Sequence, residues 1–544
     1  MRYLSENKRE DMRMKKRTAA RSMAALMGAA MVLTACGGGN TTAPTTGASS
    51  GGETQTASES AESGKITKTD IVVGQASDIV TLDPAGQQDT TSGVLMKHAY
   101  STLLDVDNEG KVVPDLAESY EMKSDTEYVF KLREDACFWD GTPVTAQDVK
   151  FSLDRAKGMP KTKSNTSKIE EVTVNGDHEV TIKLTEPYAA FKTIVTQHNL
   201  SILSEKAVTE AGDSYGDVDN LLGSGPFKVT EWVPNDHYTL VRNDNYWGEM
   251  PIATSITCRV IPEGSARTIA LEAGEIDVVW SVDPTDCANV ESNPDVKLLS
   301  QPSTGIDYVG MNTQKEKFSD KRVRQAINYA LDKQAFVDTI IEGRGLVANS
   351  YINAAIPGWT DEVEAYPYDP EKAKELLAEA GYPDGFECSI FVNGDLRTRS
   401  AQILQAQLAD VGIKVDISTY EWGALLDTLN AGEHEMFLLG WSNTSFDPDG
   451  STYQLFYSGN HGATGNRAFF SNDKVDELIL SAQRESEESK RMELYKELQF
   501  VLHEESPWCP LYYKENNVGV RSDLKGFTLH AGAQHYLGNC HYEE

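Results

Sequence analysis

The chain has 544 residues, and its 83 Asp and Glu against 50 Lys and Arg give a formal net charge of −33. With 40% hydrophobic and 24% charged residues, its composition argues against wholesale disorder and against a multi-span membrane protein. The acidic balance argues against sequence-independent nucleic-acid binding, which needs basic residues to displace counterions from phosphate. At roughly 100–200 residues per domain, the length allows two to four domains.

Residues 1–35 predict a signal peptide. They hold eight basic and three acidic side chains, and the basic cluster precedes a short apolar run from Met23 to Leu33. This run is shorter than the ~20 residues of a membrane-spanning helix. A basic segment followed by a short apolar segment is typical of a secretory signal.

The segment Leu33-Thr34-Ala35-Cys36 resembles the bacterial lipobox, in which the cysteine receives a diacylglyceryl group and becomes the mature N-terminus. Cys36 is therefore the predicted lipidation site, with an ordinary secretory signal as the alternative. Residues 37–64 are almost entirely small and polar, and such a segment cannot bury enough apolar surface to offset its ordering entropy. We expect residues 36–64 to tether a folded body to the outer face of a membrane.

The first predicted elements of the body are strands, and the later ones are mainly helices. Apolar and polar side chains alternate at 128–132 and 180–184, which is the period of a half-buried strand. A helix is predicted from Asp369, a suitable N-cap, to Gly381, a suitable end. Further helices are predicted at about 321–342, 398–411 and 473–505, and a strand at 413–417. Helix-then-strand units imply α/β layering with a partly parallel sheet.

Signals for catalysis or metal binding are weak. No His-Glu-x-x-His or Gly-x-x-x-x-Gly-Lys-Ser/Thr motif is present. Asp447 and Asp449 are a pair of carboxylates, with loop capping favoured over a hydrolytic role. The six cysteines after Cys36 contain no Cys-x-x-Cys pair, which leaves a zinc site unsupported, while one or two disulfides are possible. The tail histidines His530, His535 and His541 are expected to be exposed, and we expect no catalytic residues, no cofactor and no metal site.

Several phrases in the body occur in a characteristic order: Thr81-Leu82-Asp83-Pro84, Phe138-Trp139-Asp140-Gly141-Thr142-Pro143, Gly225-Pro226-Phe227, Asn243-Asp244-Asn245-Tyr246-Trp247 and Val323-Arg324-Gln325-Ala326-Ile327-Asn328. From about Lys68 to Tyr513 the chain thereby resembles the family 5 solute-binding proteins of ABC importers. That family includes peptide-, dipeptide- and nickel-chelate-binding proteins. Tyr420-Glu421-Trp422-Gly423 together with Gly440-Trp441 resembles the dipeptide-binding branch.

The resemblance implies an α/β fold like that of the type II periplasmic binding proteins (class or cluster C), with two lobes, a hinge and an inserted subdomain. The large lobe would comprise residues 65–304 and 511–544, with the subdomain at about 97–222, and the small lobe residues 305–510. The two crossover strands would lie near 303–312 and 510–520.

The implied function is that of a monomeric extracytoplasmic lipoprotein, held on the outer face of the cytoplasmic membrane by lipid on Cys36. It would capture a solute, foremost a peptide, in the interlobe cleft and deliver it to the permease and ATPase of an ABC transporter. It would not bind nucleic acid. Alternatives are a non-peptide solute (a nickel chelate, glycoside or opine), a surface receptor for peptide signals, or a hydrolase.

The resemblance also implies where the solute binds. The dipeptide branch places an Asp at the position of Thr444 and an Arg at about Phe391, so both charged anchors for a free dipeptide are absent here, although Arg397 lies nearby. This absence favours a longer peptide or another solute. The expected ligand-binding residues are Thr91, Ser92, Asn312, Arg397, Tyr420, Trp422, Trp441, Asn443, Thr444, Ser445, Phe446 and Asp447.

Overall fold

The computed structural model describes residues 65–544, so the predicted signal peptide, Cys36 and the linker lie outside the described residues. A mixed eleven-stranded sheet runs through this part of the chain. Its strands are β2 (Asp70–Gln75), β9 (Phe227–Val233), β10 (His237–Arg242), β11 (Ser255–Val260), β12 (Val278–Val279), β13 (Val296–Met311), β14 (Gly345–Val347), β15 (Glu387–Val392), β16 (Lys414–Thr419), β17 (Met436–Ser442) and β18 (Trp508–Arg521). Their order is β16-β15-β17-β13-β18-β12-β2-β11-β10-β9, with β14 paired to β18.

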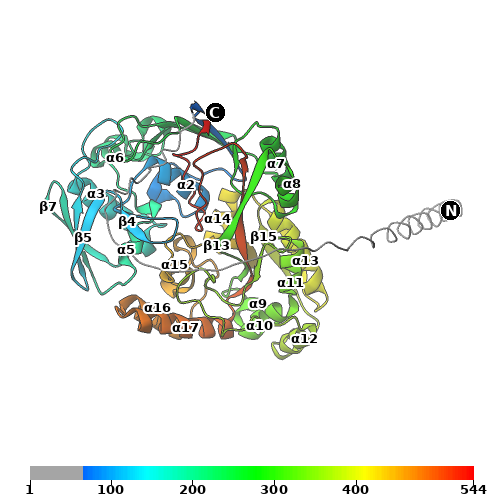
Figure 1. The fold of residues 1–544 in the computed structure, drawn as a ribbon. Helices are drawn as coiled ribbons and strands as arrows, with labels where there is room; N and C mark the ends of the chain where they lie inside the picture. Colours follow the sequence, from blue (N-terminus) through cyan, green and yellow to red (C-terminus); the bar gives the residue numbers. More distant parts are fainter. Residues whose placement is uncertain (1–64) are drawn as a thin grey trace, which may run out of the picture. The chain divides into compact units, whose positions relative to one another are not determined.

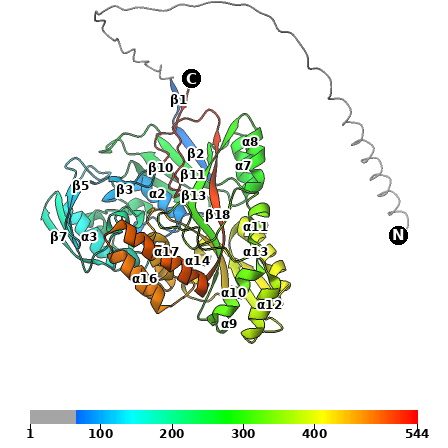
Figure 2. The same cartoon turned by 60° about the horizontal axis from the view of Figure 1, so that its bottom comes forward.

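Two long antiparallel strands, β13 and β18, connect the two ends of this sheet and lie side by side in Figures 1 and 2. Their pairing shifts between Pro302 and Ile306. On one side of the shift β18 pairs with β12, and on the other side β13 pairs with β17. We call β2 with β9–β12 the β2 half of the sheet, and β14–β17 the β17 half. The two halves are therefore joined by adjacent strands.

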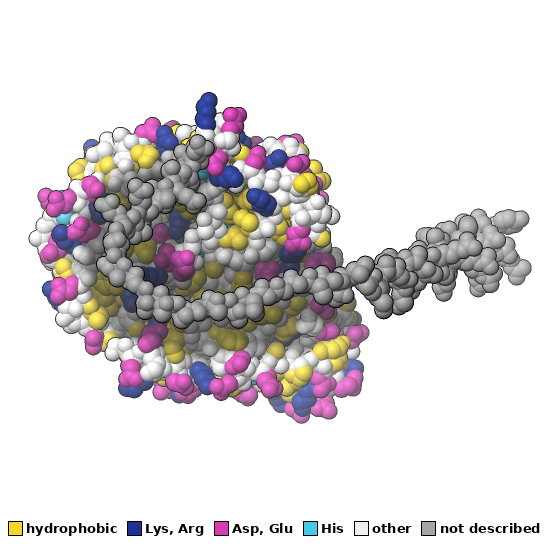
Figure 3. Space-filling view, in the orientation of Figure 1, with side chains coloured by type: hydrophobic (Ala, Val, Ile, Leu, Met, Phe, Trp, Pro, Cys, Tyr) yellow, Lys and Arg dark blue, Asp and Glu magenta, His cyan; other side chains and the backbone are white. Residues whose placement is uncertain are grey.

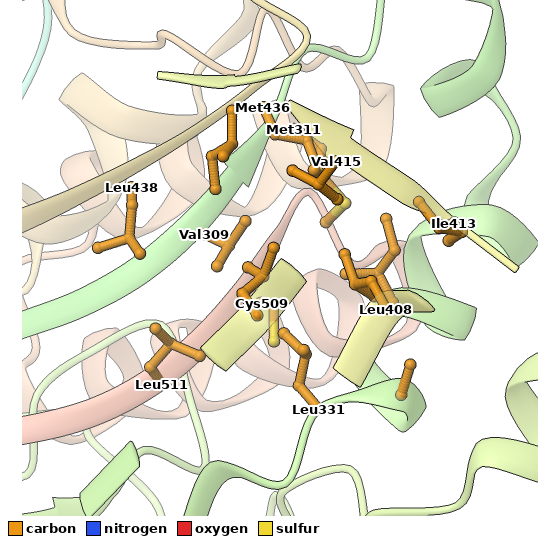
Figure 4. Close-up of a cluster of buried hydrophobic side chains, with 14 of the residues drawn as sticks. Val309, Met311, Leu331, Leu408, Ile413, Val415, Met436, Leu438, Cys509 and Leu511 are labelled. Carbon is orange, nitrogen blue, oxygen red and sulfur yellow. The ribbon is translucent and has the colours of Figure 1, made fainter. Parts of the chain in front are cut away.

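The β17 half is buried on both faces by helices. These are α9 (Glu316–Ser319), α10 (Lys321–Ala330), α11 (Lys333–Thr339), α12 (Pro370–Glu379), α13 (Gly394–Ala409), α14 (Trp422–Asn430), α15 (Asp449–Phe456), α16 (Asp473–Arg484) and α17 (Glu488–Glu505). In β17, Met436 and Leu438 pack against α10–α13, in the cluster that Figure 4 shows, whereas Phe437 and Leu439 pack against α14–α17. This alternation follows from the two-residue period of a strand.

The β2 half has a core on each face as well. Its helices are α2 (Thr90–Ala99), α6 (Glu205–Ala211), α7 (Gly264–Glu272) and α8 (Cys287–Ser292). Leu95 and Met96 of α2 lie in the core of one face, and Leu271 of α7 and Val290 of α8 lie in that of the other. Near the chain end, β1 (Ile66–Lys68) pairs with β19 (Tyr542–Glu543).

A separate four-stranded antiparallel sheet has a core of its own, built from residues between Leu103 and Ile202. Its order is β5-β6-β8-β7, and β3 and β4 form a small pair beside it. The elements are β3 (Leu104–Val106), β4 (Val112–Pro114), β5 (Ala117–Ser124), β6 (Glu127–Leu132), β7 (Ile169–Gly176), β8 (Glu179–Leu184), α3 (Ala146–Lys157), α4 (Lys163–Thr166) and α5 (Phe191–Ile194). The strands predicted at 128–132 and 180–184 are confirmed as β6 and β8.

Two of the predicted long helices are wrong, because each is broken into two. The segment 321–342 divides into α10 and α11, where the Asp332 side chain accepts a hydrogen bond from Ala335 N and caps a new helix. The segment 473–505 divides into α16 and α17 at Glu485–Glu487. The helix from Asp369 is confirmed, with its side chain capping Lys372 N. The strand predicted at 413–417 is confirmed as β16, and the helix predicted at 398–411 begins earlier, as α13.

The exposed and buried side chains of the described part differ from the sequence expectations in two ways. His530 and His535 are buried, each 2% exposed, because His530 packs edge-on against Phe446 and His535 stacks on Trp280. All six cysteines after Cys36 are free thiols.

Acidic side chains are spread over the face shown in Figure 3, with basic ones among them. None of the helices in residues 65–544 is long and apolar enough to cross a membrane.

Candidate functional site

A cavity of about 400 Å³ lies between the β2 half and the β17 half. Its volume falls within the ~300–1,000 Å³ that is usual for small-molecule sites. The lining includes Gln88, Asp89, Thr91, Gln197, Trp280 and His535 from the N-terminal part and the chain end, Arg397, Trp422, Trp441, Thr444, Gln454 and Arg467 from the β17 half, and Lys514 to Asn517 from β18. The chain thus encloses a polar site between elements that are far apart in sequence.

Five of the residues expected from the sequence line this cavity: Thr91, Arg397, Trp422, Trp441 and Thr444. The indole N–H of Trp441, at the end of β17, donates to Gly450 O at 3.0 Å, which fixes the orientation of its ring. Arg397, in the first turns of α13, donates to Asn393 Oδ1 at 2.8 Å. Their contact with a solute stays a prediction.

The loop after Trp441 is held by its own side chains, and three of the expected residues belong to this internal network. Asn443 donates to Asp447 O and Ser451 Oγ, both at 2.7 Å, and accepts from Ser445 Oγ at 2.9 Å. Phe446 has φ 54° and packs edge-on against His530. Asn443, Ser445 and Phe446 are not among the lining residues, and they shape the loop that presents Thr444.

Asp447 forms a buried ion pair instead of lining the cavity. Its two carboxylate oxygens accept from Arg491 at 2.5 and 2.9 Å, and Arg491 is 3% exposed. Because the carboxylate is fully used by this guanidinium, it is not free to take the place of the Asp that is absent at Thr444.

Three other expected residues also serve the fold outside the cavity lining. Asn312 donates to Gly432 O and His434 O, both at 3.2 Å. Ser92 is fully buried and accepts from Val80 N at 3.0 Å. Tyr420 packs against Phe391, with 4.9 Å between the ring centroids. Each of these contacts stabilises the local fold, and the sequence motifs alone do not reveal it.

Direct contacts between the two sides of the cavity close the site. Thr444 Oγ1 donates to Gln197 Oε1 at 3.0 Å, and Gln454 donates to Asn165. Tyr188, which follows β8, donates its hydroxyl to Asp449 Oδ2 at 2.5 Å. These hydrogen bonds join the segment around the four-stranded sheet to the β17 half, so the two sides of the cavity are in direct contact in this structure.

The charges on the cavity wall are mostly paired. Asp307 is buried, with Lys514 Nζ at 2.9 Å and Arg397 Nε at 3.9 Å. Arg344 pairs with Glu291 at 2.6 Å. Burial lowers the pKa of His198 and of His535 to about 3, so both rings are neutral near neutral pH. Three lining charges, Asp89, Arg467 and Glu515, form no ion pair among the described residues, and of the two acids only Asp89 has a buried oxygen without a hydrogen-bond partner. None of the three was expected from the sequence.

Chemistry other than binding finds little support in the site. Gly212-Asp213-Ser214-Tyr215-Gly216 matches the Gly-x-Ser-x-Gly pattern of hydrolases. Ser214, however, lies exposed in a 3-10 turn after α6, not in the strand-to-helix turn that the motif requires. In the part of the chain that is described, no group of three or more His, Cys, Asp or Glu is placed to hold a metal ion.

More than half of the chain matches one known protein family. The family of bacterial extracellular solute-binding proteins, family 5 (middle part), matches residues 111–463. The chain belongs to this family. Family 5 members are extracytoplasmic solute-binding proteins that deliver a solute to an ABC transporter, and this chain has that function and the family's two-lobe fold, as expected from the sequence.

Three proteins similar to this family 5 protein are named for a solute or were solved with one. The glutathione-binding protein GsiB of Escherichia coli K12 is 32% identical over 85% of this chain and 92% of its own length. The periplasmic binding protein DppA of Helicobacter pylori, solved with the peptide STSA, is 28% identical with a TM-score of 0.84, over 88% of this chain and 99% of that one. AgaA of Agrobacterium tumefaciens R10, solved with agropinic acid, is 27% identical with a TM-score of 0.82, over 87% and 99%.

Proposed function

We propose that this family 5 protein captures a short peptide in the cavity between the β2 half and the β17 half. The observation that carries the proposal is a cavity of about 400 Å³ between the two halves whose lining combines aromatic rings, amides and charged groups. That volume suits a solute of a few residues. The peptide STSA in H. pylori DppA and the glutathione named for GsiB are solutes of this size class.

Capture would proceed by closure of the two lobes. An open form would bind solute on one side, and contacts from the other side would stabilise the closed form. The large lobe (65–304 and 511–544, with the subdomain at about 97–222) and the small lobe (305–510) would move about β13 and β18. Trp441, Thr444 and Arg397 would contact the solute. No bond is made or broken.

The protein would act at the cell surface as a lipid-anchored monomer. Lipid on Cys36 would hold it to the outer face of the cytoplasmic membrane, and the linker to residue 64 would give it a reach on the order of 30 Å as a flexible coil. From there the closed form would meet the permease of the importer.

An opine is the second candidate solute, because AgaA was solved with agropinic acid at similar identity. To decide, the chain from Lys65 onward is purified from its host and the retained solute is identified by native mass spectrometry. We expect a peptide. If no peptide is retained and a peptide library causes no thermal shift, the peptide proposal fails, and recovery of an opine supports the second candidate.

Replacing Tyr188 by phenylalanine should weaken solute binding about tenfold. The lost hydrogen bond to Asp449 joins two sides of the closed form, and hydrogen bonds to charged groups contribute roughly 1.5–3 kcal/mol. The fraction of protein that keeps its solute through purification measures the effect. Tyr120→Phe is the matched control, since Tyr120 is 40% exposed on β5. Equal retention by both variants would show that this contact does not hold the closed form.

A further inference from the structure

Arg467 is a buried cation on the cavity wall without a counter-ion. Its side chain is 6% exposed, and Nε donates to Asn430 Oδ1 at 3.0 Å. The backbone carbonyl of Arg467 accepts from His434 Nε2 at 2.8 Å, which fixes the loop that carries it. Within residues 65–544, no carboxylate forms an ion pair with Arg467, and its two terminal nitrogens donate no hydrogen bond. A buried charge in this state is costly unless a partner arrives.

The other cations near the cavity differ from Arg467 in this respect. Lys514 contacts Asp307, Arg344 contacts Glu291, and Arg399 donates two hydrogen bonds to Asp283, at 2.7 and 2.9 Å. Each of these cations is neutralised by the protein itself. Among the described cations that line the cavity, only Arg467 has no carboxylate within ion-pair distance, although the charge of Asp89 lies near enough to favour its charged form.

Asp89 is the corresponding anion. Its Oδ1 accepts from Ser92 N at 3.0 Å and caps helix α2, but its buried Oδ2 has no hydrogen-bond partner. Capping of helix α2 accounts for the position of Oδ1 but leaves Oδ2 without a partner. Burial raises the pKa of Asp89, and hydrogen bonding to Ser92 opposes that rise. The indole N–H of Trp422 also lowers this pKa, yet Trp422 Nε1 is itself buried without a completed hydrogen bond.

We propose that Arg467 binds a carboxylate of the solute and Asp89 binds its ammonium group. The inference rests on the proposed capture of a solute in this cavity and names the class of that solute: a zwitterion with both charged groups free. A buried cation without an ion pair and an anion with a buried, unpartnered oxygen lie on the wall of one cavity, and a ligand that carries the opposite pair of charges would complement both. Arg467 and Asp89 would supply the charge pairing that Thr444 and Phe391 do not.

The binding of the ammonium group and of the carboxylate can be tested separately with a random library of dipeptides to tetrapeptides. The library is prepared in three forms: with free ends, N-acetylated and C-amidated. Binding is measured on the mature chain by titration and thermal shift. We expect the free-ended library to bind, and each capped library to bind at least tenfold more weakly. Equal binding of a capped library would overturn the assignment for the end that it blocks.

Two conservative variants test which residue binds which end of the peptide. Arg467→Gln should bind the C-amidated library as well as the free one, while still rejecting the acetylated library. Asp89→Asn, which keeps an N-capping side chain, should show the reverse selectivity. Arg322→Gln is the control, because Arg322 is exposed and pairs only with Asp320. A variant that keeps wild-type selectivity would overturn the role of its residue.

Failure of peptide binding itself is distinguishable from failure of this inference. If no library binds, the proposed peptide solute is wrong, but any solute retained on purification must still carry both a cation and an anion. In addition, ligand-free Arg467→Gln should melt at or above the wild-type temperature, because it removes an uncompensated buried charge. A clearly lower melting temperature would make Arg467 a structural residue and overturn the inference.

Discussion

Replacing Arg491 by methionine should lower the free energy of unfolding by about 3–5 kcal/mol, the usual loss when one partner of a buried ion pair is removed. Arg491 lies on α17 and contacts both oxygens of Asp447, and its guanidinium lies 5.2 Å from the Tyr495 ring centroid. The variant would leave the Asp447 carboxylate buried without a cation. Urea unfolding followed by circular dichroism measures the change.

The controls for this prediction separate burial from charge. Arg322→Met removes an exposed pair with Asp320 and should cost less than about 1 kcal/mol. Combining Arg491→Met with Asp447→Leu removes both buried charges and should recover part of the loss. If Arg491→Met alone unfolds at the wild-type urea concentration, the ion pair does not hold the loop after Trp441.

Lowering the pH from about 7 to about 5 should destabilise the protein, because six buried or half-buried histidines are neutral in the folded state. Burial lowers the pKa of His98, His434, His503 and His530 to about 4, and of His198 and His535 to about 3. In the unfolded chain they take up protons near pH 6.5. Between about pH 6.5 and pH 4 the unfolded state therefore binds more protons, and stability falls by up to about 1.4 kcal/mol per pH unit for each histidine.

Three acids act in the opposite direction. Burial raises the pKa of Asp115 to about 7 and of Asp449 to about 6, and it also raises the pKa of Asp89, so the folded state keeps these protons when the unfolded state has lost them. Six histidines against three acids leave an excess of three, and the slope is at most about 4 kcal/mol per pH unit. Urea midpoints at several pH values test this. A midpoint that does not fall would mean that the rings are accessible to protons in the folded state.

Local sequence patterns predicted those parts of the fold that depend on neighbours in the chain. The strands β6 and β8 follow from alternation, and α12 follows from Asp369 and Pro370. The break between α10 and α11 was missed because buried apolar residues continue on both sides of Asp332, while its capping hydrogen bond to Ala335 N forms only in the structure. The lengths of β13 and β18 depend on pairing with each other across about 210 residues.

The candidate site was predictable only in part, for a similar reason. The segment around Trp441 was correctly expected to approach the cleft, since Trp441 and Thr444 line the cavity. Asp447 forms its ion pair with Arg491, which lies 44 residues further along the chain, and no local sequence pattern predicts that pairing. Whether Arg467 has an ion-pair partner depends on all the residues that surround it in the folded structure. A lone arginine directly before Ala468-Phe469-Phe470 was the only sequence signal that this cation is buried.

The central position of β18 also bears on how the chain acquires its structure as it is made. Val278 and Val279 of β12 pair with Val520 and Gly519, and Ile66 pairs with Glu543. The β2 half thus contains early segments but lacks its neighbour β18, which pairs with β12, until residues 508–521 have been synthesised. Contacts of such sequence separation form slowly, because a long loop must close first. A nascent chain of this topology stays incompletely folded until β18 has been made, and an incompletely folded chain is the form that can pass through a narrow membrane channel.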